Sequence, residues 1–426
     1  MHFEPQAVPA EMPSLVQRFV SITSWKPWEK RLKAFDQRVA DNPFLDEYLA
    51  QRYPIELAMG RLHRRLLRGQ KVKLPTSYED TVLLSFIAMV ARAHPRLNPP
   101  GRRRLDGMLR SGLDTDAGLA PLEHEMGIAT HLMGRGFDVT FSDIETGTGF
   151  DFPAEKDGAV LEVECKTVSG DLGRRIHLRR LYQLGGRVYP LMSAALERCL
   201  GGQLARIVLP SRLHGTDQQL EAICEALASA LNTGRSIVGP EPCAIEYQQF
   251  SLAGSPFERV DPANIGREDV RQYVEQAVGR PLGHVVMLFR PRSGLVMVAV
   301  ESLQKDEVVK GLVQQLKDAV KRQFSGTRPG VVCVKFIDVT QRDLLELVEQ
   351  DRSDQPSTLK LATSYLLNRP DWTPVHTLAY FTPGHSVTSQ VVNGPVLTRS
   401  VQEQGHTYTF KNPHNAMAGD ARLSIF

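Results

Sequence analysis

Residues 14 to 113 carry hydrophobic side chains at helical spacing, in segments separated by prolines. Apolar residues recur every three or four positions in SLVQRFVSI, DEYLAQRY, IELAMGRLHRRLLRG and YEDTVLLSFIAMVARAH. This is the period of an amphipathic helix, and the alternation typical of a strand is absent here. The pattern predicts a helical N-terminal domain over residues 1–114.

From Leu119 onward the pattern changes to a mixture of helices and strands. The helix PLEHEMGIATHLMGRG precedes three strand-like runs, FDVTF, FDFPA and AVLEVECKTV, which a basic helix RRIHLRRLYQL and a buried-type strand ARIVLP follow. This α-β-β-β-α-β order predicts an α/β core domain over residues 115–240. The remaining residues, 241–426, combine hairpin-like strands, the helix KDEVVKGLVQQLKDAVKRQ and the strand GVVCVKFIDV, and predict a mixed α/β C-terminal domain.

The predicted strand AVLEVECKTV, residues 159–168, carries charges at every second position. Glu162, Glu164 and Lys166 alternate with Val163 and Cys165, so one face of the strand is ionic and the other is apolar. The simplest interpretation is an antiparallel strand with one solvated face, in an unrelated α/β protein that binds no metal. The alternative is that the ionic face carries chemistry.

A second acid strengthens the chemical interpretation. Asp151 lies thirteen residues before Glu164, in the segment GTGFDF, whose glycines allow the chain to turn sharply. Two carboxylates on neighbouring strands form an oxygen-ligand pocket suited to Mg²⁺ or Mn²⁺. Lys166 would share their face and could orient or deprotonate a water and stabilise charge on a phosphate. The arrangement suits metal-assisted hydrolysis of a phosphodiester bond.

In this element order, Asp151, Glu164 and Lys166 resemble the motif of the PD-(D/E)xK nuclease superfamily, although Phe150 stands where a Pro is frequent. The resemblance covers residues 115 to 210. It implies a restriction-endonuclease-like, Holliday-junction-resolvase-like α-β-β-β-α-β core, with a helical N-terminal domain and a mixed α/β C-terminal region added. It also implies that Asp151 and Glu164 hold the metal while Lys166 positions the attacking water.

The same resemblance implies one further acid at the metal site. In archaeal Holliday-junction resolvases and related members, a Glu on the first core helix lies shortly before a Gly-Phe that opens the first strand. Glu125 precedes Gly136-Phe137 at a similar spacing, so the resemblance implies Glu125 rather than Glu123. The alternative role of Glu125 is that of an ordinary acid in the first helical turn, where it would stabilise the helix dipole.

Two basic segments are candidates for binding nucleic acid. Arg174, Arg175, Arg179 and Arg180 are predicted at the start of a helix, where positive charge opposes the helix dipole, so we expect them to contact phosphates. Between Arg61 and Arg110, twelve Lys and Arg residues accompany only three acids, a local balance of +9. This cluster suits a nucleic-acid backbone. The alternative for both segments is a solvated helix face.

Composition excludes several classes of protein. The chain has 426 residues, of which 42% are hydrophobic, and a formal net charge of only +3, which excludes a general polycation. Its five cysteines show no C-x-x-C spacing, which argues against a disulfide framework and against a structural zinc site. Neither a signal peptide nor a membrane span is evident, so we expect a cytoplasmic protein.

The sequence therefore predicts a nuclease dependent on Mg²⁺ or Mn²⁺ that acts on DNA in repair, restriction or defence against foreign DNA. The rival hypothesis is a catalytically inactive nuclease-like fold that serves as a nucleic-acid-binding or sensing module. The sequence leaves open whether the protein forms a homo-oligomer or has a protein partner.

Overall fold

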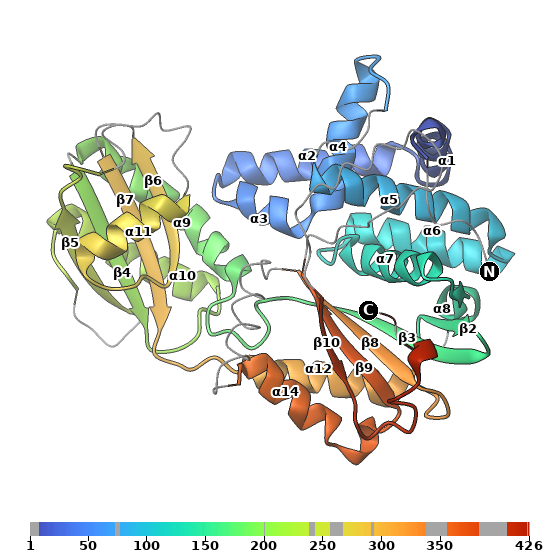
Figure 1. Ribbon diagram of the computed structural model, residues 1–426. Coiled ribbons are helices and arrows are strands. Elements are labelled where there is room, and N and C mark those ends of the chain that lie inside the picture. Colours follow the sequence, from blue (N-terminus) through green and yellow to red (C-terminus); the bar gives the residue numbers. More distant parts are fainter. Residues whose placement is uncertain are drawn as a thin grey trace. The chain divides into compact units, whose positions relative to one another are not determined.

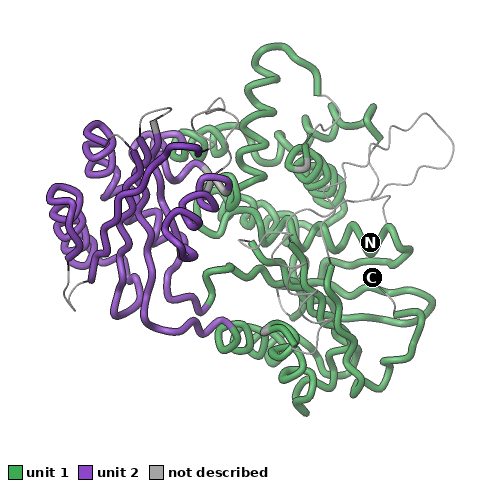
Figure 2. The backbone as a smooth tube through the Cα atoms, turned by 60° about the vertical axis from the view of Figure 1, so that its left-hand side comes forward, with its two compact units in different colours: residues 1–35, 49–172, 309–426 green, residues 36–48, 173–308 purple. Residues whose placement is uncertain are grey.

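The computed structural model describes residues 8–72, 77–147, 149–199, 201–237, 243–255, 267–290, 294–337, 356–382, 407–423 and 425. The chain divides into two compact units, shown in green and purple in Figure 2. Unit 1 consists of Met1–Phe35, Leu49–Leu172 and Val309–Phe426, and unit 2 of Asp36–Tyr48 and Gly173–Val308. The units do not follow the three consecutive domains expected from the sequence. Strands from the C-terminal part of the chain belong to unit 1 together with the N-terminal helices.

The N-terminal region is helical, as its hydrophobic spacing predicts. Its helices are α1 (Met12–Thr23), α2 (Lys26–Asp41), α3 (Leu45–Arg52), α4 (Pro54–Leu67), α5 (Tyr78–Ala93) and α6 (Pro99–Asp114), and α7 (Ala120–Gly134) follows. Side chains cap two of these helices: Ser77 accepts the N–H of Asp80 at 3.2 Å and Asn98 accepts that of Gly101 at 2.7 Å. Lys73 of the basic cluster lies outside the described residues.

Unit 1 contains a mixed sheet of six described strands in the order β1-β2-β3-β8-β9-β10 (Figure 1). The strands are β1 (Asp138–Val139), β2 (Phe152–Lys156), β3 (Ala159–Val168), β8 (Gly330–Phe336), β9 (Val375–Phe381) and β10 (Thr407–Lys411), and the short helix α8 (Ser142–Thr146) connects β1 to β2. The first three strands pair antiparallel, and β8 then pairs parallel with β3. Strand β9 is parallel to β8, and β10 is antiparallel to β9.

Helices cover both faces of this sheet. Leu161 and Val163 of β3 share a core with Met126 and Ile128 of α7. On the other face, Val168 shares a core with Leu316 of α12 (Val308–Gln323) and with α14 (Thr358–Leu367). Figure 1 shows α7 on one side of the strands and α12 with α14 on the other. The charged face of β3 therefore does not look into solvent.

The last helix and strand of the predicted core lie elsewhere, and this part of the sequence prediction is wrong. Helix α9 (Leu178–Arg198) and strand β4 (Gly201–Leu209) belong to unit 2, whose sheet has the order β5-β4-β7-β6. Its other elements are α10 (Asp217–Thr233), β5 (Ala244–Phe250), α11 (Arg267–Val278), β6 (His284–Arg290) and β7 (Gly294–Ser302). The hydrophobic pattern of a buried strand is the same whichever sheet the strand joins, because local hydrophobicity does not specify its partner strand.

The structure as a whole is mixed α/β, as the sequence predicts. None of the described helices has the length and apolar character needed to cross a membrane.

Candidate active site

The charged face of β3 is buried, which overturns the solvated-strand interpretation. Glu162 and Glu164 are each only 1% exposed, and the side chain of Lys166 is 27% exposed. Burying a carboxylate without a partner is costly. The two acids are stabilised in different ways, and this difference separates a structural residue from a candidate catalytic one.

Glu162 is anchored by hydrogen bonds. Its carboxylate accepts the backbone N–H of Ser325 at 2.9 Å and the Ser325 hydroxyl at 2.5 Å. Ser325 lies between α12 and β8, so these bonds hold that connection against β3. Glu162 therefore has a structural role, with both carboxylate oxygens occupied.

Glu164 has a much less complete set of partners. It forms an ion pair with Lys166, and apart from this pair neither of its oxygens accepts a hydrogen bond from the described residues. Burial and the nearby charge of Asp151 raise the pKa of Glu164 to about 7, although Lys166 opposes the shift. Glu164 thus offers buried oxygen atoms that protein donors do not satisfy.

Asp151 lies at the point where β2 and β3 separate. It immediately precedes β2, in which Phe152 pairs with Val163 of β3, so Asp151 falls beside Glu164. The backbone N–H of Cys165 donates a 2.6 Å hydrogen bond to Oδ2 of Asp151. Burial nevertheless raises the pKa of Asp151 to about 6.

Helix α7 contributes Glu125 to the same group. Burial, followed by the charges of Asp151, Asp143 and Glu164, raises the pKa of Glu125 well above its ordinary value. Glu123 instead forms an ion pair with Lys335 of β8. The structure thus brings Glu125, and not Glu123, into electrostatic contact with the other carboxylates.

Asp143 of α8 is a neighbour that sequence reasoning missed. Its backbone N–H donates to the carbonyl oxygen of Asp151 at 3.3 Å, and its charge contributes to the raised pKa values of Asp151 and Glu125. The only sequence signal was its position in SDIET, directly before the glycine-containing turn that leads to Asp151.

The chemistry of these side chains fits a hard divalent cation. All the candidate ligands are carboxylates, the donors preferred by Mg²⁺ and Mn²⁺. A cation would stabilise their charged forms, which burial and, to a lesser extent, neighbouring acids disfavour. Among the described residues, no group of three or more His, Cys, Asp or Glu side chains already has an arrangement that could hold a metal ion. A ligand set that includes Glu125 would therefore need its carboxylates to move.

The structure gives two of the predicted phosphate-binding arginines other partners. Arg174 and Arg175 precede α9 and form ion pairs with Asp306 at 3.2 and 3.9 Å. Arg175 also donates to the carbonyl oxygens of Ser302 and Gln304, at 2.7 and 2.8 Å. The expectation that these two arginines begin the helix is wrong. Their bonds to Ser302, Gln304 and Asp306 connect the beginning and the end of Gly173–Val308, the long segment of unit 2.

Arg179 and Arg180 do lie in the first turn of α9. Arg180 donates to Oε1 of Gln183 at 3.0 Å. All four predicted phosphate-binding arginines belong to unit 2, whereas the candidate active-site residues belong to unit 1. Their contact with phosphate remains a prediction.

Comparisons of this chain with known protein families, with curated proteins and with solved structures find no match. The functional assignment therefore rests on the chemistry of the chain's own residues.

Proposed function

We propose that this protein is a divalent-metal-dependent nuclease that hydrolyses phosphodiester bonds of DNA. The observation that carries the proposal is the buried group formed by Asp151, Glu164 and Lys166. Burial raises the pKa values of both acids, and the charge of Asp151 adds to the shift of Glu164. Apart from its pair with Lys166, the Glu164 carboxylate accepts no hydrogen bond from the described residues. Strongly perturbed carboxylates beside a lysine are typical of catalytic sites.

The order of elements in unit 1 supports the proposal. Helix α7 is followed by the antiparallel strands β1, β2 and β3, and then, after the long segment of unit 2, by α12 and by β8, which is parallel to β3. Apart from the short helix α8 between β1 and β2, this order matches the α-β-β-β-α-β core that we propose. In this proposal α12 and β8 take the places that the sequence assigned to α9 and β4.

Asp151 and Glu164 would hold the cation, with Glu125 assisting and Asp143 adding negative charge beside them. When bound, a divalent cation polarises a phosphoryl oxygen and lowers the pKa of a bound water. The hydrogen bond from Cys165 to Asp151 fixes one ligand to the main chain of the strand that carries the other. Asp151 is thereby positioned by the backbone of β3.

Lys166 would act as a cation in this site. Burial lowers the pKa of Lys166. The charge of Glu164 and the hydrogen bond that Lys166 donates to it outweigh that effect, so the pKa of Lys166 is raised. The ammonium group therefore stays protonated at neutral pH. It would donate to a phosphate oxygen that gains negative charge and orient the attacking water, and it would not remove that water's proton.

The proposed setting is the cytoplasm, where such an enzyme would serve DNA repair, restriction or defence against foreign DNA. The rival is a nuclease-like module that binds or senses nucleic acid without cutting it. The two differ in one outcome, which is whether a nucleic acid that the protein binds is also cleaved.

The deciding experiment is incubation of the full-length protein with labelled single- and double-stranded DNA and RNA, in Mg²⁺, Mn²⁺ or EDTA. We expect metal-dependent cleavage of DNA that is lost in Asp151→Asn and retained in Glu155→Gln, which changes an exposed acid on β2. Binding without cleavage under every condition would favour the sensing module. Equal cleavage by Asp151→Asn and the parent would overturn the site.

A further inference from the structure

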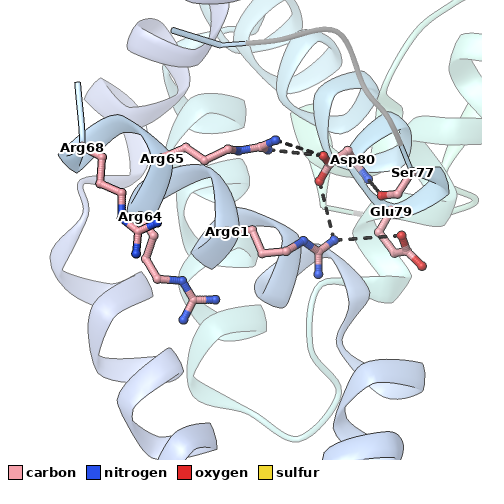
Figure 3. Close-up of a pocket in the computed structure, with 7 residues that line it drawn as sticks. All are labelled: Arg61, Arg64, Arg65, Arg68, Ser77, Glu79 and Asp80. Carbon is pink, nitrogen blue, oxygen red and sulfur yellow. Dashed lines mark hydrogen bonds and ion pairs between the residues drawn. The ribbon is translucent and has the colours of Figure 1, made fainter. Parts of the chain in front are cut away.

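Unit 1 has a second charged feature, on helix α4. The last two turns of α4 and the start of α5 line an open hollow of about 440 Å³ (Figure 3). The residues around it are Arg61, Arg64, Arg65, Arg68, Ser77, Glu79 and Asp80. Four guanidinium groups accompany only two carboxylates, so the hollow carries excess positive charge.

Two of the arginines form the wall of the hollow. Both terminal nitrogens of Arg65 lie 3.3 Å from Oδ2 of Asp80, and Arg61 lies 3.6 Å from Asp80 and 4.0 Å from Glu79. Asp80 is itself buried, and its backbone N–H is held by Ser77. These interactions make the wall rigid and neutralise the charge of Arg61 and Arg65.

The other two arginines are not neutralised. Arg64 and Arg68 are exposed, and no ion pair or hydrogen bond joins either side chain to another described residue. Figure 3 shows both on the side of α4 that faces away from Asp80 and Glu79. They are four positions apart at one end of α4, with Arg64 in the last turn of the helix and Arg68 at its C-cap.

We propose that Arg64 and Arg68, supported by this wall, bind phosphates of a nucleic-acid backbone. The choice of nucleic acid as the polyanion rests on the proposed nuclease function. The choice of an anion of any kind as the ligand rests on the excess positive charge of the hollow itself. A guanidinium group presents paired donors that match phosphate oxygens. Two of them at one end of a helix can engage nearby phosphates of a strand and release the counterions condensed there.

The alternative is that Arg64 and Arg68 only interact favourably with the C-terminal end of the α4 dipole. In that case, replacing them would lower the stability of the protein and leave its affinity for nucleic acid unchanged. If Arg64 and Arg68 bind phosphate, replacing them should lower the affinity for nucleic acid and leave the stability of the protein close to that of the parent.

The test is fluorescence anisotropy of labelled double-stranded DNA with the full-length protein, in EDTA and at several NaCl concentrations. We compare the parent with Arg64→Ala/Arg68→Ala and with Arg18→Ala/Lys33→Ala. The control pair is exposed on α1 and α2, lies outside the hollow and outside the basic cluster, and removes the same charge. Thermal unfolding checks that each variant is folded.

We expect the Arg64/Arg68 variant to bind about tenfold more weakly and to lower the slope of log affinity against log salt by ~2, about one unit for each phosphate that the variant no longer neutralises. The control should change affinity less than ~2-fold, as expected for charge removed away from the bound DNA. An unchanged slope, equal weakening in both variants, or no DNA binding by the parent would overturn the inference.

Failure of this inference can be distinguished from failure of the nuclease proposal. If the parent cuts no nucleic acid with Mn²⁺ but its DNA affinity depends on Arg64 and Arg68, the phosphate-binding role of the hollow is supported and the nuclease proposal is contradicted. If the parent cuts DNA in an Asp151-dependent manner while the Arg64/Arg68 variant binds normally, only the hollow falls.

Discussion

The backbone N–H of Cys165 donates a 2.6 Å hydrogen bond to Oδ2 of Asp151. It connects the residue before β2 to the middle of β3, between Glu164 and Lys166. Because the donor is the main chain, the position of the Asp151 carboxylate depends on the ladder of the sheet and not on a flexible side chain. The candidate site is thereby built on two rigid strands.

Lys166 should be needed for cleavage but not for binding. Its ammonium group would stabilise charge that develops on the phosphate during reaction, so Lys166→Ala should lower the cleavage rate by ~100-fold or more, as removal of one such group does in other enzymes. Affinity for DNA and Mn²⁺ should remain close to that of the parent. The measurement is a single-turnover rate with Mn²⁺, beside Lys156→Ala on β2 as the control. Equal rates for both variants would remove Lys166 from the catalytic group.

Glu162 should matter for stability alone. Glu162→Ala leaves the Ser325 N–H and hydroxyl without their buried acceptor, which should cost about 1–3 kcal/mol of unfolding free energy in urea denaturation. Glu162→Gln, which keeps an acceptor, should cost less. Cleavage per folded molecule should match the parent in both variants. A loss of cleavage with unchanged stability would place Glu162 in the catalytic group instead.

The carboxylates of the site should make stability fall with pH when no metal is bound. Burial raises the pKa values of Asp151 and Glu164 from 3.8 and 4.5 to about 6 and 7, so the folded state holds these protons more tightly than the unfolded state. Their stabilising contribution is present at low pH and is lost as pH rises towards 7.

Bound Mn²⁺ should offset this loss, because its ligands must be deprotonated. The increase in Tm caused by Mn²⁺, measured against EDTA, should therefore be larger at pH 8 than at pH 5.5. The double variant Asp151→Asn/Glu164→Gln should show a smaller pH-dependent fall than the parent and should lose the Mn²⁺ effect. An undiminished effect of Mn²⁺ in that variant would contradict the proposed ligands.

Glu56 of α4 should give a second, metal-independent pH effect. It is 1% exposed, and it accepts the N–H of Leu119 at 3.1 Å. Burial raises its pKa to about 7 from 4.5, so its contribution to stability is lost between these pH values, by an amount on the order of 3 kcal/mol. Glu56→Gln keeps an acceptor for Leu119 and removes the titration. Urea unfolding at pH 5 and pH 8, in EDTA, should show a smaller difference in this variant than in the parent.

The arginines of unit 2 should separate into two pairs. Arg179→Ala/Arg180→Ala should flatten the salt dependence of DNA binding and leave the Tm close to that of the parent. Arg174→Ala/Arg175→Ala breaks the interactions with Asp306 and with two carbonyl groups, and should lower the Tm. The same change of slope in both pairs would show that the ion pairs with Asp306 do not set the roles of these arginines.

The sequence alone determined much of the local structure and of the candidate site. Helical and alternating spacing predicted the N-terminal helices and the strand that carries Glu164 and Lys166. Chain order and spacing were enough to select Asp151, and the resemblance to a nuclease motif was enough to prefer Glu125 over Glu123. The predictions of helices and strands succeed where the signal is local, because backbone geometry fixes which side chains share a face. The roles of Asp151 and Glu125 remain predictions.

Only the tertiary structure decided what covers each face and which strand lies beside which. Alternation put Glu162 and Glu164 on one face of β3, but helix α12, which packs on that face, and strand β8, which pairs with β3, come after the long segment of unit 2. Strand pairing joins distant parts of a chain, so the sequence analysis placed β4 in the core and did not identify β8 as the neighbour of β3. The anchoring of Glu162 by Ser325 depends on such a distant contact, and short-range sequence patterns do not encode it.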